Sequence, residues 1–135
     1  MTMRPLFLDL TQVLLVHKDQ IERYGGDPGI KNLGLLQSAV AMPSAGFEGS
    51  FLHKDLFEMA AAYLYHITRN HPFVDGNKRT GAACALVFLE LNGIEVQADE
   101  DELVEIVTAV AEGTVRKEAI EDFFRRNASP GSSGL

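Results

Sequence analysis

The residues of this chain best suited to chemistry stand together in NHPFVDGNKRTG, residues 70–81, between two long apolar stretches. Positions 71–79 hold an imidazole, a carboxylate, a carboxamide, an ammonium and a guanidinium. A turn needs only the proline and the glycine. The other polar groups therefore indicate a ligand site in a loop between two helices.

The second half of this loop has the composition of an anion site. Gly76 lets the backbone approach a ligand closely, and Asn77 is predicted to cap the helix that follows. The first turn of a helix carries unpaired N–H groups and a partial positive charge. Lys78 and Arg79 add two cations to this turn, where their charge opposes the helix dipole. A bound anion would remove that conflict, and phosphate is the natural candidate.

The first half of the loop adds groups for proton and metal chemistry. Asp75 lies beside the expected anion site, and a carboxylate next to bound phosphates is a reasonable Mg²⁺ ligand. His71 has the side chain most often used as a general base, and it can take a proton from a hydroxyl group. A base, a metal ligand and a phosphate site together are what phosphoryl or nucleotidyl transfer requires.

Each of these residues also has an ordinary structural interpretation. A histidine before a proline often caps or packs, Asp-Gly-Asn is a common turn, and Lys-Arg on a helix is often a solvated face. The combination favours a ligand site, because helix capping alone would place acids, and not Lys78 and Arg79, in the first turn.

Helical patterns flank the loop on both sides. Apolar residues recur at helical spacing in 54–71, and this helix must end before Pro72. A second long helix runs from Asn77 to Gly93 and is apolar on nearly all sides, which predicts a place at the centre of the core. Further helices are predicted at residues 12–24, capped by Thr11, and at 33–42, 100–113, capped by Asp99, and 116–127.

The predicted fold class is therefore all-α, a compact bundle of about six or seven helices with a short irregular flap before the central helix. The flap is PSAGFEGS, residues 43–50, which has no helical pattern and is expected to be a loop or an irregular hairpin. Residues 94–97, IEVQ, are at most one short extended piece. One domain is expected over 1–128, with a disordered tail over 129–135.

The composition excludes several classes of protein. With 135 residues and 46% hydrophobic residues, one globular domain is expected. The net charge of −7 argues against a general affinity for nucleic acid or anionic membranes, and against a small DNA-binding regulator. The single cysteine, Cys84, lies in an apolar run and is predicted to be a buried structural thiol of a cytoplasmic protein. The N-terminus has no hydrophobic segment typical of a signal peptide.

The motif HPFVDGNKRT, residues 71–80, also resembles the signature of the Fic/Doc superfamily, H-P-F-x-[D/E]-G-N-[G/K]-R. The chain is most similar to the Doc (death-on-curing) branch, whose members are toxins of toxin–antitoxin modules. YGGDPGIKNLGLLQSAV, residues 24–40, and the helix before the motif are Doc-like too, so that the resemblance spans about residues 5–125. It implies the Fido fold.

The resemblance implies a role for each residue of the motif. His71 would be the base that activates a target hydroxyl, and Asp75 would hold Mg²⁺. The phosphates of ATP would be bound by Gly76, Asn77, Lys78 and Arg79. The flap residues Gly46, Phe47, Glu48 and Gly49 would hold an extended segment of the target protein by main-chain pairing.

Two departures from the Fic pattern bear on which group is transferred. Fic enzymes that transfer AMP carry glycine at the position of Lys78 and a second arginine at the position of Ala82. A lysine side chain fills the space where phosphates would otherwise lie against the backbone, and Ala82 offers no clamp for the terminal phosphate. The triphosphate is therefore expected to sit differently, with its γ-phosphate presented to the hydroxyl. This matches the Doc branch, which resembles a protein kinase in activity.

The resemblance also implies partners. The target would be a serine or threonine of a translation elongation factor, and its phosphorylation would arrest protein synthesis. An antitoxin, bound as a helix in an apolar groove, would control the toxin. Two alternatives remain open: transfer of AMP to the hydroxyl, and a catalytically inactive domain that only binds a partner protein.

Overall fold

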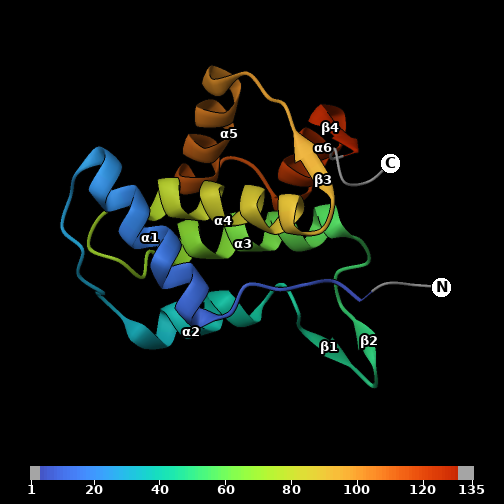
Figure 1. Cartoon of the computed structure of the whole chain (residues 1–135), viewed down its shortest axis with the longest axis horizontal. Coiled ribbons are helices and arrows are strands. Elements are labelled where there is room, and N and C mark those ends of the chain that lie inside the picture. Colours follow the sequence, from blue (N-terminus) through green and yellow to red (C-terminus); the bar gives the residue numbers. More distant parts are fainter. Residues whose placement is uncertain (1–3, 131–135) are drawn as a thin grey trace.

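The computed structural model describes residues 4–130, in which helices and a few short strands follow one another (Figure 1). The helices are α1 (Leu10–Tyr24), α2 (Leu33–Ala41), α3 (Leu56–Asn70), α4 (Asn77–Leu91), α5 (Glu100–Glu112) and α6 (Lys117–Asn127). The strands are β1 (Gly46–Phe47), β2 (Ser50–Phe51), β3 (Ile94–Val96) and β4 (Ala128–Pro130). The predicted all-α bundle with a short flap is confirmed. Within residues 4–130, no helix has the length and apolar character needed to span a bilayer.

Helices α3 and α4 lie side by side at the centre of the molecule, with α1 and α2 below and to the left of them and α5 and α6 above (Figure 1). Both central helices bury apolar faces, from Met59 to Ile67 on α3 and from Cys84 to Leu89 on α4. The prediction that the second long helix belongs to the core is confirmed. This pairing also fixes where the α3–α4 loop emerges.

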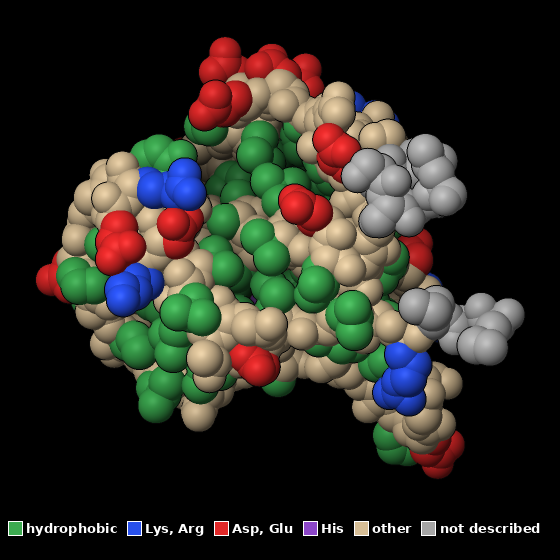
Figure 2. Space-filling model, in the orientation of Figure 1, with side chains coloured by type: hydrophobic (Ala, Val, Ile, Leu, Met, Phe, Trp, Pro, Cys, Tyr) green, Lys and Arg blue, Asp and Glu red, His purple; other side chains and the backbone are tan. Residues whose placement is uncertain are grey.

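The face shown in Figure 2 is hollowed beside α5 and above α4, and the hollow belongs to a groove that these helices form with the end of α1. Apolar side chains line the hollow, and the acidic side chains of the first turn of α5 stand above it (Figure 2). This apolar groove has a volume of about 450 Å³, and its apolar lining is Tyr24, Ala82, Ala83, Leu86, Leu103, Val104 and Val107.

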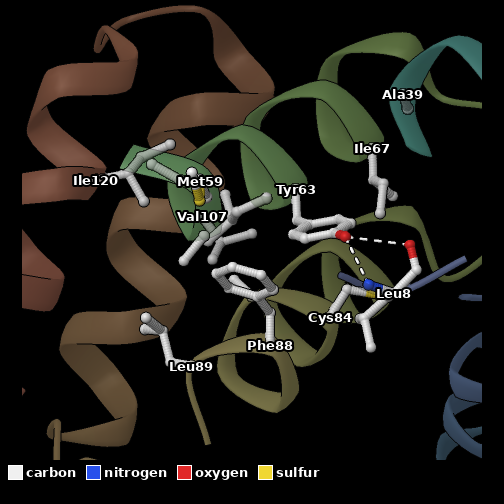
Figure 3. Close-up of a cluster of buried hydrophobic side chains, with 14 of the residues drawn as sticks. Leu8, Ala39, Met59, Tyr63, Ile67, Cys84, Phe88, Leu89, Val107 and Ile120 are labelled. Carbon is white, nitrogen blue, oxygen red and sulfur yellow. Dashed lines mark hydrogen bonds between the residues drawn. The ribbon is translucent and has the colours of Figure 1, made fainter. Parts of the chain in front are cut away.

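A buried tyrosine fastens the extended N-terminal segment to the core (Figure 3). The Tyr63 hydroxyl accepts a hydrogen bond from the Leu8 N–H at 2.8 Å and donates one to the Leu8 carbonyl at 3.1 Å. Cys84 is fully buried nearby, and burial raises the pKa of its thiol to about 12. The prediction of a structural, unreactive cysteine is therefore confirmed.

The predicted cap of the first helix is wrong. Asp9, and not Thr11, is the N-cap of α1: its side chain accepts a hydrogen bond from the Gln12 N–H, and the Gln12 side chain accepts one from the Asp9 N–H. This reciprocal pair satisfies two free N–H groups, whereas Thr11 lies inside the first turn. The predicted cap of α5 is confirmed, since the Asp99 side chain accepts a hydrogen bond from the Asp101 N–H.

The C-terminal strand β4 pairs antiparallel with β3, with Val96 opposite Ala128 and Ile94 opposite Pro130. The domain boundary expected at residue 128 thus falls inside this strand, and Ser129 and Pro130 belong to the sheet. The rest of the predicted tail, residues 131–135, lies outside the described residues.

Helix α6 is joined to α3 through the side chain of Lys117. Its ammonium group lies 3.1 Å from Nε2 of His66 and 3.5 Å from Nε2 of His53, and 5.5 Å from the centre of the Tyr65 ring. An ammonium group can only donate hydrogen bonds, so both imidazoles accept at Nε2 and are neutral. Burial, and then the charge of Lys117, lower the pKa of His66 to about 4 and lower the pKa of His53.

We expect this contact to make stability depend on pH. The folded-state pKa of His66 lies below its ordinary value of 6.5, so that the stabilisation is complete above that pH and is lost as the pH falls toward about 4. At His66, the neighbouring His53 and Lys117 disfavour the extra charge, whereas at His53 it is favoured by Glu58 and by the backbone of Pro43. The free energy of unfolding in urea should therefore fall between about pH 7 and about pH 5.

The His66→Gln variant should flatten that dependence, because glutamine does not titrate. His71→Gln removes an exposed imidazole and serves as the control, with an expected pH dependence close to that of the unchanged protein. An equal pH dependence in the His66 variant and the unchanged protein would contradict this assignment.

Candidate active site

The loop between α3 and α4 begins with a residue in a left-handed conformation. His71, with φ of 51° and ψ of 54°, ends α3, and its N–H donates a hydrogen bond to the Ile67 carbonyl at 3.3 Å. Pro72 cannot continue the helix, because it has no N–H group to donate. The chain therefore turns sharply and leaves the His71 side chain exposed at the end of α3.

Asn77 fixes the shape of this loop, and its predicted role as helix cap is wrong. Its side-chain oxygen accepts a hydrogen bond from the Phe73 N–H, and its side-chain nitrogen donates one to the Phe73 carbonyl, both at 2.9 Å. The cap residue is instead Gly76, whose φ of 79° suits glycine, and no side chain caps the helix. The amide N–H groups at the start of α4 are thus left without side-chain acceptors.

A second loop, residues 25–32, supports the first by backbone pairing. The N–H groups of Lys31 and Asn32 donate to the Pro72 carbonyl at 2.7 and 3.0 Å, and the Val74 N–H donates to the Gly29 carbonyl at 3.0 Å. In the sequence, residues 27–32, DPGIKN, show only the pattern of a turn. Their contribution depends on pairing between positions at least 40 residues apart, which no local pattern reveals.

His17 on α1 supports the same loop from below. Its ring stacks on the ring of Phe73, with centroids 3.7 Å apart, and its Nε2 lies 2.9 Å from the Asp75 carbonyl oxygen, to which it donates. His17 is 3% exposed. The available sequence signal was its place between Val13 and Ile21, four residues from each, on the buried face of α1.

The Asp75 carboxylate is held in place at one oxygen. Oδ2 accepts a hydrogen bond from the Asp27 N–H at 2.7 Å, which leaves Oδ1 for another ligand. Within residues 4–130, no group of three or more acidic, histidine or cysteine side chains is placed to hold a metal. A single free carboxylate oxygen such as Oδ1 of Asp75 is compatible with Mg²⁺, which often takes one protein carboxylate and completes its shell with phosphate oxygens and water.

These side chains meet in one cavity of about 480 Å³ at the start of α4. The active-site cavity is lined by Thr68, Arg69, His71, Val74, Asp75, Gly76, Asn77, Lys78, Arg79 and Ala111. It brings together all the residues predicted for catalysis, metal binding and phosphate binding. The flap residues 46–49 do not line it.

The cations of the active-site cavity differ in how firmly they are held. The Lys78 side chain is exposed, and no carboxylate within residues 4–130 lies within 4.0 Å of it. The Arg79 guanidinium donates to the Gly25 carbonyl at 3.0 Å and lies 5.4 Å from the centre of the Tyr24 ring. Lys78 is thus free to move toward an anion, whereas Arg79 is fixed at the edge of the cavity.

Arg69 is a third cation of this cavity, although it lies outside the motif at residues 71–80. Its guanidinium donates to the carbonyls of Val110 and Ala111 at the end of α5, at 3.4 and 3.0 Å. A side chain at Gly113 would lie 3.1 Å from the guanidinium. The only signal in the sequence was a basic residue two positions before His71.

The flap is a short hairpin in which β1 and β2 pair antiparallel, with Phe47 opposite Ser50. Glu48 and Gly49 form its turn with φ of 49° and 81°. The Phe47 side chain is 78% exposed. The hairpin expected as one form of residues 43–50 is therefore present, and its role in target binding stays a prediction.

The contact between His71 and Lys31 fixes the tautomer of the candidate base. The Lys31 ammonium lies 3.3 Å from Nδ1 of His71. Because the ammonium donates, a neutral His71 ring accepts at Nδ1 and carries its proton on Nε2. The nitrogen able to take a proton is the one that Lys31 covers.

Comparison with known proteins places the chain in a family. A model of the Fic/DOC family matches residues 7–89. The chain is 45% identical over 78 residues to "Toxin Doc" of Mycolicibacterium smegmatis, covering 58% of this chain and 60% of that protein. It is 35% identical over 115 residues to "Protein kinase doc" of Escherichia phage P1, covering 85% of this chain and 90% of that protein.

We expect Asn77→Ala to destabilise the protein by about 2 kcal/mol or more, because it leaves a buried N–H and a buried carbonyl of Phe73 unpaired. Asn127→Ala is the matched control, since it removes one hydrogen bond, to the Phe123 carbonyl, at the end of α6. Its expected cost is about 1 kcal/mol. The measurement is urea unfolding, and equal losses in the two variants would contradict the role given to Asn77.

We expect Lys31→Met to release the tautomer preference of His71. In the unchanged protein at about pH 8.5, where an ordinary histidine is neutral, ¹H–¹⁵N spectra of the ring should show the proton on Nε2. In Lys31→Met, signal from the Nδ1–H form should appear, and in the exposed control Lys18→Met the spectrum should stay unchanged. A predominantly Nδ1–H ring in the unchanged protein would refute the assignment.

Proposed function

We propose, from the premise that this chain belongs to the Fic/DOC family, that it is the toxin of a toxin–antitoxin module and acts as a protein kinase. It transfers the γ-phosphate of ATP to a serine or threonine hydroxyl of a protein target. A translation elongation factor is the target that the Doc resemblance favours. The protein would work in the cytoplasm, where ATP and this target are found.

The observation that carries the proposal is the convergence of His71, Asp75 and Lys78 on one cavity at the uncapped start of α4. The N–H groups of the first turn and the Lys78 ammonium favour the phosphate chain of a nucleotide. The residues come from two ends of one loop that Asn77 holds in shape. Positioning and charge stabilisation are the main demands of phosphoryl transfer.

His71 acts as the general base in this proposal. The target oxygen forms a bond to the γ-phosphorus while the bond from that phosphorus to the bridging oxygen of ADP breaks, and His71 receives the hydroxyl proton. Lys31 must first leave Nδ1. A bound triphosphate supports this movement, since it attracts an ammonium group more strongly than a neutral imidazole does.

Asp75 fits the Mg²⁺ expected for this reaction, since it offers one free carboxylate oxygen beside the phosphate site. When bound, Mg²⁺ would neutralise charge on the phosphate oxygens. The hydrogen bond from the Asp27 N–H orients the carboxylate before any ligand arrives. Gly26 allows this approach, because a side chain there would meet Cβ of Asp75 at 3.0 Å.

The apolar groove favours γ-phosphate transfer over AMP transfer. It shares Lys78 and Arg79 with the active-site cavity, and Ala82 lies in its wall. A nucleoside placed in the groove, beside Tyr24 and Ala82, would direct the phosphate chain across Lys78. The terminal phosphate would then be the one nearest His71.

The same groove suits the antitoxin that the proposal requires. Its lining of alanine, leucine and valine from α4 and α5 matches the apolar face of a helix. An antitoxin helix in this place would exclude the nucleoside. Inhibition would then need no contact with His71.

The test uses ATP labelled with ³²P at either the α- or the γ-position, Mg²⁺ and a bacterial lysate. We expect label from the γ-position alone to appear on a protein, and we expect His71→Ala to abolish both the labelling and growth arrest on expression. The exposed Lys18→Ala variant is the control and should retain both activities.

Label retained only from the α-position would show AMP transfer and overturn the kinase proposal. Growth arrest by His71→Ala equal to that of the unchanged protein would instead favour the alternative, a domain that only binds a partner.

A further inference from the structure

A further cavity, of about 590 Å³, opens beside the active-site cavity at the start of α6. It is lined by Tyr65, Arg69, Gly113, Thr114, Val115, Arg116, Lys117 and Glu118. Arg69 lines both cavities, so the two are neighbours. We call it the α6 cavity.

The α6 cavity is strongly basic in an acidic protein. Three cations, Arg69, Arg116 and Lys117, face one acid, Glu118, whereas the whole chain has a net charge of −7. Within residues 4–130, no carboxylate lies within 4.0 Å of any of the three cations. Their charge is thus not neutralised by the protein itself.

Lys117 is also held by neutral groups only. His53 and His66 accept its hydrogen bonds, and the Tyr65 ring lies beneath it. These contacts position the ammonium group but leave its charge intact. A partly buried ammonium group that is held in position in this way can bind an anion from another molecule.

The helix beside the cavity, α6, has one acid, Glu118, in its first turn but no side-chain cap. Arg116 is the N-cap of α6, and no side chain caps the helix. Arg116 and Lys117 therefore place two cations where the helix dipole is already positive. An anion in the α6 cavity would interact favourably both with the three cations and with the positive end of the α6 dipole. The three cations would attract it more strongly than the dipole does.

The α6 cavity neighbours the active-site cavity and is linked to the flap segment through one side chain. At one side, Lys117 contacts His53, which follows strand β2 of the flap by two residues. At the other side is Arg69, which precedes His71 by two residues and shares its cavity. An extended segment reaching from the flap to His71 would therefore pass the α6 cavity.

We propose that the α6 cavity binds an acidic side chain of the target protein, carried on the same segment as the acceptor hydroxyl. Arg69 and Arg116 suit a carboxylate because guanidinium groups can bind both of its oxygens, and Lys117 adds a third donor. The inference rests on the proposed function in assuming a protein acceptor. It adds that acidic residues near the hydroxyl select the target.

The test measures peptide binding without nucleotide. The probe is a fluorescein-labelled Gly-Ser peptide with three glutamates, compared with the same peptide carrying three glutamines, by fluorescence anisotropy. We expect saturable binding of the glutamate peptide alone. Arg116→Ala should weaken it about tenfold, the effect of losing one charge-assisted hydrogen bond.

Arg126→Ala is the matched control, because it removes an exposed arginine of the same helix far from the cavity, and it should leave the affinity unchanged. Arg116 is exposed too, so both variants should fold, which circular dichroism checks. Equal binding of the two peptides, or unchanged affinity in Arg116→Ala, would overturn the inference. Because the binding test contains no ATP, its result does not depend on the outcome of the kinase assay. A negative binding result would likewise leave the result of the kinase assay unchanged.

Discussion

The two hydrogen bonds between the Asn77 side chain and the Phe73 backbone are the interaction on which the active-site loop depends. They link the two ends of the loop at a buried position, where leaving a hydrogen-bonding group unpaired costs the most free energy of folding. Because the Asn77 side chain is bound to Phe73, the N-cap of α4 is Gly76, and the first N–H groups of the helix have no side-chain acceptor. The same interaction therefore shapes the loop and leaves the helix start open to a ligand.

A second feature of the molecule is where its unneutralised cations lie. Lys78 at the start of α4, and Arg116 and Lys117 at the start of α6, all oppose a helix dipole, and within residues 4–130 no carboxylate lies within 4.0 Å of them. In a chain of net charge −7 this placement destabilises the unliganded protein locally. The physical explanation that we favour is that an anion binds at each place. The start of α4 would bind the nucleotide, and the start of α6 would bind the acidic segment of the target protein.

The sequence predicted what depends on local patterns and missed what depends on long-range contacts. Helix periodicity and Pro72 located the central pair of helices. The motif identified residues that the structure brings into one cavity, and it identified the family, which is confirmed. The prediction that Asn77 caps the helix was wrong because its side chain is hydrogen-bonded to the buried backbone of Phe73. A rule based on capping preferences does not take such a partner into account. Arg69 was missed for a similar reason, since only the packing of α5 brings it to the cavity.

The central claim is that the start of α4 is formed in advance to hold a triphosphate. Titration of the ¹⁵N-labelled protein with ATP and Mg²⁺, followed through its backbone amide signals, tests this most directly. The account predicts saturable shifts at Lys78 and Arg79 while the Phe73 and Asn77 signals show an unchanged loop. Amide signals at the start of α4 that do not move at millimolar ATP would contradict it.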